Sequence, residues 1–277
     1  MRVLSRIRHL LERVWAFLVV LDEHDVTSAA SAMAFHAFFS LVPLFALSGW
    51  AVQHVVKADV AAFAPLFRFT PTAVNLVADA ELMRLSESSH VVLPPLSIAG
   101  FLWLCSGGLS QSMHQFEKVF GHPTRSWLRR RAIALGWVLI ALAVTAGGVV
   151  LGVYVDRFGD LGTFVARWLI PFLGLWLLLG FFFRHATLRE RNGTRRGFVG
   201  ALLTLGFWTV LSAAFSIYVR DLADYSRFFG GVAAVAVLLL WLWLMSLSLL
   251  VGGELNARME RTRDAKRDET AGDDAAL

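Results

Sequence analysis

The last long apolar stretch of the chain has the length of a membrane-spanning helix. No charged residue lies between Arg227 and Glu254, which leaves 26 uncharged positions. As an α-helix this run is roughly 39 Å long, whereas the hydrocarbon core of a bilayer is about 30 Å thick. The pattern therefore predicts a transmembrane helix over residues 228–253, with Gly252, Gly253 and Glu254 at its end.

Other apolar stretches of similar length precede this one, separated by charged or turn-rich segments. Together they predict an all-α, polytopic membrane protein with a transmembrane domain over residues 27–256. The six spans are expected at residues 27–52, 91–113, 132–155, 163–183, 198–219 and 228–253.

The segments outside the spans differ in character. Residues 1–26 repeat apolar side chains every three or four positions with arginines between them, which predicts an amphipathic helix lying in the membrane interface. Residues 53–90 form a loop on the opposite side of the membrane. Residues 257–277 are charged and poor in large apolar side chains, so we expect a disordered tail.

Composition supports the membrane class, and the distribution of charge orients the chain. Apolar residues make up 57% of the sequence and charged residues 17%, and the mean hydropathy is +0.60. Of the 26 Lys and Arg residues, 19 lie in the terminal segments and the loops after spans two and four, and 7 lie in the other loops. The positive-inside rule then places both termini in the cytoplasm. Because orientation explains the basic loops, we predict no nucleic acid partner.

Polar and small residues gather in the predicted cytoplasmic half of the spans. Polar groups at membrane depth need partners or water, so we expect a polar cavity open to the cytoplasm. Two readings stay open for the ionisable candidates: His36 is either functional or a packing residue, and Glu254 either a partnered buried carboxylate or an ordinary interfacial charge. The candidate residues are Ser28, His36, Ser40, Pro43, Gln111, His114, Gly252, Gly253, Glu254 and Asn256.

The sequence does not predict an enzyme. It has no phosphate-binding loop of the Walker type, no GxSxG and no HExxH motif. We predict no catalytic residue, no metal site and no cofactor. The single cysteine, Cys105, excludes an intramolecular disulfide and is interpreted as a small packing residue.

Two motifs carry a resemblance to a known family. AFFSLVPLF ends the first span and LLVGGELNA ends the last, and over roughly residues 20–260 the chain resembles the YihY / virulence factor BrkB family of bacterial inner-membrane proteins. The resemblance implies a six-helix protein of the inner (plasma) membrane with no settled biochemical activity. Some members are associated with serum resistance and others with lipid or lipopolysaccharide traffic, and a ribonuclease label also occurs in the family. The chain departs from the family pattern at Phe35-His36, where an aromatic pair is usual, and at Glu117, where Asn is usual.

Two functional classes follow. The first is a transporter or flippase-like protein for a lipid or other amphiphile, driven by a gradient or a partner because no ATP-binding motif is present. The alternative is a non-transporting scaffold or regulator of envelope assembly. Membrane lipids are the expected partners in both, and a ribonuclease is disfavoured because Trp127, near Arg125 and Arg129, is the only aromatic residue suited to RNA.

Overall fold

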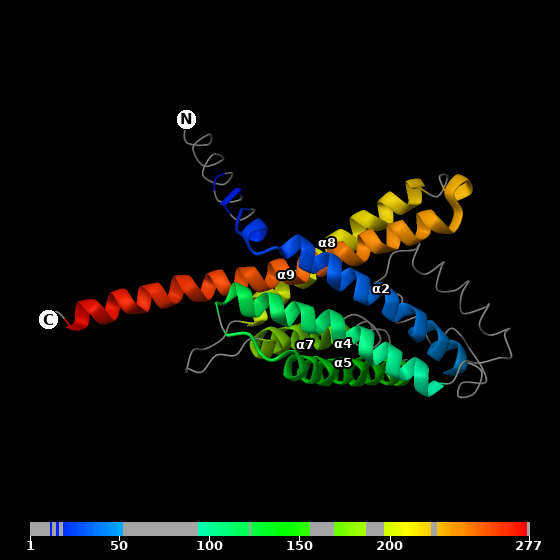
Figure 1. Ribbon diagram of the computed structural model, residues 1–277, viewed down its shortest axis with the longest axis horizontal. Helices are drawn as coiled ribbons and strands as arrows, with labels where there is room; N and C mark the ends of the chain where they lie inside the picture. The colour runs from blue at the N-terminus through cyan, green and yellow to red at the C-terminus, as the bar shows by residue number, and fades with distance from the viewer. Residues whose placement is uncertain are drawn as a thin grey trace.

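The computed structural model describes residues 12, 15–16, 19–51, 94–121, 123–155, 169–186, 197–222 and 226–275 (Figure 1). No strand occurs in these ranges, so the all-α prediction is confirmed. The predicted loop 53–90 and most of the predicted N-terminal helix 1–26 lie outside them. The long helices are α2 (Val26–Ala51), α4 (Pro94–Val119), α5 (Trp127–Val155), α7 (Ile170–Ala186), α8 (Gly197–Leu222) and α9 (Ser226–Ala275).

Each of the six predicted spans coincides with one of these helices, although the ends shift by several residues. Within the described ranges, four segments are long and apolar enough to cross a membrane. Helix α4 is not among them because its second half is rich in polar residues, and the described part of α7 has only 17 residues. The count of six spans therefore stays a prediction. The four segments are Val26–Leu47, Trp127–Gly148, Gly197–Tyr218 and Ala234–Thr262.

The C-terminal segment 257–277 corrects the expectation of disorder. Helix α9 has 50 residues and continues to Ala275, and its C-terminal end, red in Figure 1, extends away from the other helices. The physical reason lies in the composition of this segment, in which Ala and Arg are frequent and proline is absent. These residues favour helix even without an apolar face to bury, and the preceding span supplies a formed helix to extend, which removes the cost of nucleation.

Two antiparallel hairpins form the centre of the bundle. In α2 and α4, Gln115 donates to the carbonyl of His24 at one end, and Gly100 faces Pro43 at the other. In α8 and α9, Asn256 meets Gly200 and the Trp208 indole donates to the Met245 carbonyl over 2.9 Å. Helix α5 packs mainly against α4 and α7 mainly against α8, whereas α5 and α7 share a shorter contact; α9 also packs against α2.

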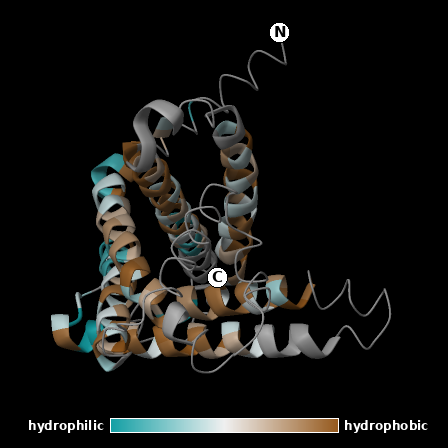
Figure 2. Cartoon of the chain, turned by 90° about the vertical axis from the view of Figure 1, so that its right-hand side faces the viewer, coloured by the Kyte–Doolittle hydropathy of each residue, from teal (hydrophilic) through white to brown (hydrophobic). Residues whose placement is uncertain are grey.

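The outward faces of these helices are apolar. Large apolar side chains are exposed along most of the helices, and Figure 2 shows hydrophobic residues along much of the length of the helices in view. A contiguous apolar exterior is stable in lipid and not in water, which agrees with a membrane protein. Examples from α5, α7 and α8 are Leu139, Ile140, Leu142, Phe172, Leu173, Leu202, Phe207 and Val210.

The best-packed region lies at one end of the bundle. The start of α2, the end of α4, the start of α5, the end of α7 and the start of α8 meet there around α9. Its centre is Phe116, which makes edge contacts with Phe182 and Phe183 at ring-centroid distances of 6.3 and 5.5 Å. Gathering these ends together is what alternating passes through a membrane require, and it brings the polar residues of the chain into one region.

Candidate functional site

Two fully buried carboxylates mark the packed end of the bundle. Glu117 of α4 and Glu254 of α9 each have 0% of their surface exposed. A buried charge costs several kcal/mol unless it is paired and hydrogen-bonded, so the partners of these two groups define the site.

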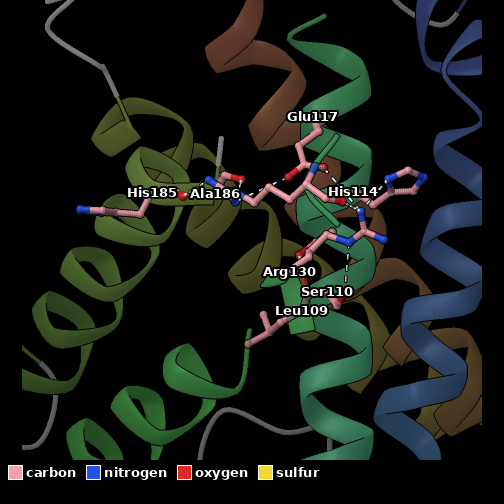
Figure 3. A network of polar contacts seen from close by, with 9 residues as sticks. Leu109, Ser110, His114, Glu117, Arg130, His185 and Ala186 are labelled. Atoms are coloured by element: carbon pink, nitrogen blue, oxygen red, sulfur yellow. Dashed lines mark hydrogen bonds and ion pairs between the residues drawn. The ribbon is translucent and has the colours of Figure 1, made fainter. Parts of the chain in front are cut away.

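Glu117 is held by two arginines from the loop and helix that follow it (Figure 3). The Arg125 guanidinium lies 3.6 Å from Oε1, and the Arg125 backbone N–H donates to Oε2 over 3.2 Å. Arg130 places Nη1 3.5 Å from Oε2. The carboxylate thus joins the end of α4 to the start of α5.

The same arginines extend the network to a third helix. Arg125 donates from Nη1 to the Ala186 carbonyl over 2.9 Å and from Nη2 to the His185 carbonyl over 3.3 Å. These are carbonyls of the last turn of α7, where a cation also complements the helix dipole. Arg130 contacts Ser110 Oγ at 3.3 Å and His114 Nδ1 at 3.2 Å. The candidate His114 therefore belongs to this network.

Glu254 joins α9 to the turn that precedes α2. Its Oε2 lies 3.1 Å from Nδ1 of His24, and its Oε1 lies 4.0 Å from Nε of Arg258 one turn later. From the sequence, Glu254 is either a partnered carboxylate or a plain interfacial charge, and its geometry is that of a partnered one. The nearby histidine is His24, outside the predicted first span, and not the candidate His36.

Gly252 and Asn256 hold α9 against α8. The Asn256 Oδ1 accepts a hydrogen bond from the Gly200 backbone N–H over 2.9 Å, and Nδ2 faces the Gly197 carbonyl at 3.4 Å. The first of these contacts satisfies a backbone N–H in the first turn of α8, where N–H groups have no partner within the helix. At Gly252 a Cβ would overlap Thr204 Oγ1, so the two backbones approach as closely as glycine allows.

Gly253 faces the opposite neighbour. A Cβ there would lie 2.7 Å from Cδ1 of Phe116 on α4. The adjacent glycines therefore allow α9 to pack closely on α8 and on α4 at the same level.

His36 lies farther along α2, against α4. A Cβ on Gly107 would lie 2.7 Å from the His36 ring and 2.9 Å from Nη1 of Arg131, so both side chains rest on that glycine. His36 Nδ1 is buried without a hydrogen-bond partner among the described residues. This arrangement does not connect His36 to Glu254.

The other candidates are dispersed. Ser28 is exposed, Gln111 is half-buried, and Pro43 lies inside α2 facing Gly100. Ser40 is buried and donates to the Ala37 carbonyl of its own helix over 2.6 Å. The structure does not bring these four residues into one site.

The cavity bordered by the polar candidates is small. Gly253 and Asn256 line a space of about 10 Å³ together with Phe116 and Glu260, roughly the volume that one water molecule requires. The expected polar cavity open to the cytoplasm is not what these residues form. Their polar groups join helices instead.

A much larger cavity lies between α5 and α7. It is a groove of about 760 Å³, within the range of ligand-binding sites. Arg125, Arg129 and His185 lie at one end, and none of the ten candidate residues lines it. Its walls are largely apolar and include Ile133, Trp137, Ile140, Val144, Leu177 and Phe181.

Sequence reasoning missed the Glu117 network and the groove. A signal for the first was present: Glu117 is the only acidic residue between Glu87 and Asp156, and four arginines follow it within 14 positions. Those arginines were interpreted only as a signal of membrane orientation, so their pairing with Glu117 was not predicted. The sequence contains no comparable signal for the groove, because its two walls come from separate helices.

Within the described residues, no three His, Cys, Asp or Glu side chains lie close enough together to hold a metal ion. The acids of the site are paired with arginine and histidine. The polar side chains of the packed end therefore join helices, and the groove between α5 and α7 is a separate feature of the bundle.

Comparisons with known proteins agree with the membrane assignment. The chain is 25% identical over 256 residues to the "Putative ribonuclease-like protein YfkH" of Bacillus subtilis (strain 168), covering 87% of this chain and 92% of the relative. It is 24% identical over 268 residues to a "UPF0761 membrane protein" of Aeromonas salmonicida (strain A449), covering 90% and 88%. No solved structure matches. The family model described as "Virulence factor BrkB" matches residues 17–276, and the chain belongs to that family of membrane proteins.

Proposed function

We propose that this protein is a transporter or flippase-like protein for a lipid or other amphiphile. The observation that carries the proposal is the groove between α5 and α7, about 760 Å³ in volume, with apolar walls and a basic end. An amphiphile has the same division into an apolar body and a polar head. The polar end of the groove adjoins the packed end of the bundle, and its apolar walls belong to outward faces of two helices.

The helix contacts around the groove favour movement over a fixed channel. Along α5, Leu139, Leu142 and Val144 are exposed, while the strongest polar links of this region gather at its first turns, around Arg125 and Arg130. A helix pair held firmly at one end and loosely along its length is suited to opening and closing a groove.

A second candidate is a non-transporting scaffold or regulator of envelope assembly. The observation that favours it is the use of Glu117, Glu254 and Asn256 to join helices. A scaffold needs rigidity at that end and no ligand in the groove. Blocking the groove should therefore abolish the function of a transporter and leave the function of a scaffold unchanged.

We propose the inner membrane as the location, with both termini in the cytoplasm. The support is the 19-to-7 division of Lys and Arg and the gathering of the basic ends at the packed end of the bundle. A ribonuclease activity is not proposed. That word occurs in the name of one relative, whereas three of the four arginines here, Arg125, Arg130 and Arg131, are engaged with Glu117, backbone carbonyls and a tryptophan ring.

The test is lipid movement in reconstituted vesicles. Purified protein is inserted into vesicles that hold a fluorescent phospholipid, and an impermeant reductant bleaches the label in the outer leaflet, with and without an imposed pH gradient. We expect wild-type protein to make the inner-leaflet label accessible faster than empty vesicles do.

Blocking the groove supplies the matched comparison. No described atom lies within 4 Å of a Cβ on Gly136, which lines the groove, or on Gly206, which lies on α8 away from it. Gly136→Leu should abolish the acceleration and Gly206→Leu should keep it. Wild-type vesicles that behave like empty vesicles under both conditions would refute transport and favour the scaffold.

A further inference from the structure

The start of α5 carries three consecutive arginines that meet three different surroundings. Consecutive residues of a helix point about 100° apart, so Arg129, Arg130 and Arg131 leave it in different directions. Arg130 is paired with Glu117. Arg131 lies over the Trp103 ring, with its guanidinium carbon 4.3 Å from the ring centroid.

Arg129 faces the groove and has no counter-ion. It is exposed and makes no ion pair with any residue in the part of the chain that the structure describes. Arg125, beside it, is committed to Glu117 and to the last carbonyls of α7. Among the described residues, Glu117 is the acid paired with the arginines of this corner, and Arg129 adds a further positive charge at the groove end.

His185 completes the polar end. Its Nδ1 donates to the Phe181 carbonyl over 2.8 Å, so in the neutral ring Nε2 is an acceptor and lies free for a hydroxyl or other donor of a ligand. Arg129 therefore supplies the donors to an oxyanion at the mouth of the groove.

The length of the groove matches one leaflet of a bilayer. From Arg129 to Val144 is 15 residues, or roughly 22 Å of helix. Half of the hydrocarbon core is about 15 Å, so the groove spans one leaflet and part of the headgroup layer. An acyl chain lying along it would contact Ile133, Ile140 and Leu177, which line its walls.

We propose that the groove binds a phospholipid with an anionic headgroup, whose phosphate contacts Arg129 and whose chain lies between α5 and α7. This inference rests on the proposed function and names its substrate class. Arg129 determines the preference for negative charge, and the apolar walls bind the chain whatever the headgroup is.

Native mass spectrometry of the full-length protein in detergent tests the proposal, with dioleoyl phosphatidylglycerol and dioleoyl phosphatidylcholine as the two probes. Wild-type protein should bind the anionic lipid more tightly. Arg129→Gln should weaken that binding by roughly tenfold, as expected for one charge-assisted hydrogen bond, and should leave phosphatidylcholine binding unchanged. Arg129→Lys should retain much of the preference because the charge remains.

Two controls separate the groove from the general surface charge. Lys118→Gln removes the same charge from an exposed position at the end of α4 and should change neither affinity. Gly136→Leu should weaken both lipids, because it fills the apolar part. Equal affinity of wild-type protein for both lipids, or an equal loss in Lys118→Gln and Arg129→Gln, would overturn the proposal.

Other occupants give distinct results. Displacement of the anionic lipid by millimolar inorganic phosphate would mean that the site recognises the ion alone. A dimer that dissociates in Gly136→Leu would place a second copy of the chain in the groove. Either result overturns the proposal. Selective binding of the anionic lipid without lipid movement in vesicles would support this inference and refute the proposed function. Lipid movement without a preference for the anionic lipid would support the proposed function and refute this inference.

Discussion

The closest helix contact at the site gives the sharpest prediction about stability. At Gly252 of α9, a Cβ would overlap Oγ1 of Thr204 and would lie 3.0 Å from the carbonyl oxygen of Gly200. Gly206, two residues beyond Thr204 on α8, has no described atom within 4 Å of its own Cβ position. The same substitution, Gly→Ala, therefore adds a methyl group to a filled contact at Gly252 and to open space at Gly206.

The magnitudes follow from two terms. Replacing glycine by alanine inside a helix stabilises it by about 1 kcal/mol, and this term is common to both positions. Overpacking a filled contact costs about 1–3 kcal/mol, and it applies only at Gly252. We expect Gly206→Ala to be neutral or stabilising, and Gly252→Ala to be less stable than Gly206→Ala by about 1–3 kcal/mol.

Thr204→Ala identifies the source of the cost. It removes the overlapping Oγ1 and leaves the residue's Cβ at 3.4 Å from the Cβ position of Gly252, an ordinary contact. The double variant Gly252→Ala/Thr204→Ala should therefore recover part of the loss, so that the two substitutions are non-additive. By itself Thr204→Ala loses only a hydrogen bond to the Gly200 carbonyl within α8.

The assay is reversible unfolding of the purified protein in mixed micelles, followed by circular dichroism as the fraction of denaturing detergent rises. All four proteins are compared at one protein concentration. Equal stability of Gly252→Ala and Gly206→Ala, or no recovery in the double variant, would show that α8 and α9 do not approach as described.

The remaining predictions concern the buried acids and the orientation. Glu117→Gln leaves buried arginine charge uncompensated and should lower the free energy of unfolding by about 3–5 kcal/mol, measured in the same micelles. The control Glu23→Gln, at an exposed position, should change that free energy by no more than about 0.5 kcal/mol. Similar values for the two variants would contradict the Glu117 network. Glu254→Gln should still insert and fold but lose the cellular phenotype, and its effect on unfolding should be non-additive with His24→Gln by about 1 kcal/mol; full complementation of a deletion would make the pair dispensable for function. A reporter fused after Leu277 should read as cytoplasmic and one within residues 53–90 as external, and the reverse reading would overturn the topology.

The polar groups of the bundle divide into two kinds. Glu117, Glu254 and Asn256 are paired within the protein and hold its helices together. Arg129 faces a groove and has no such partner among the described residues. A paired group contributes to stability, whereas an unpaired charge at a ligand-sized opening is available for recognition.

The sequence by itself determined the class of the protein and the positions of its helices. Whether a segment enters a membrane depends on its own summed hydrophobicity, which is a local property. Residues 198–219 illustrate this, since they coincide with α8 (Gly197–Leu222) to within a few positions. The charged segment after Asn256 was misjudged because disorder was inferred from the lack of an apolar face, whereas helix propensity and an already formed helix suffice to continue α9.

Only the tertiary structure decided which polar groups meet. Glu254 and His36 were both candidates from the sequence, but the partner of Glu254 is His24, which lies 230 residues away. Which histidine reaches a carboxylate depends on how each helix is rotated about its axis and where two helices cross, and a residue's place in an apolar run records neither. The same holds for the three consecutive arginines of α5, which the sequence alone does not distinguish. In the folded bundle Arg130 pairs with Glu117, Arg131 lies over the Trp103 ring and Arg129 faces the groove.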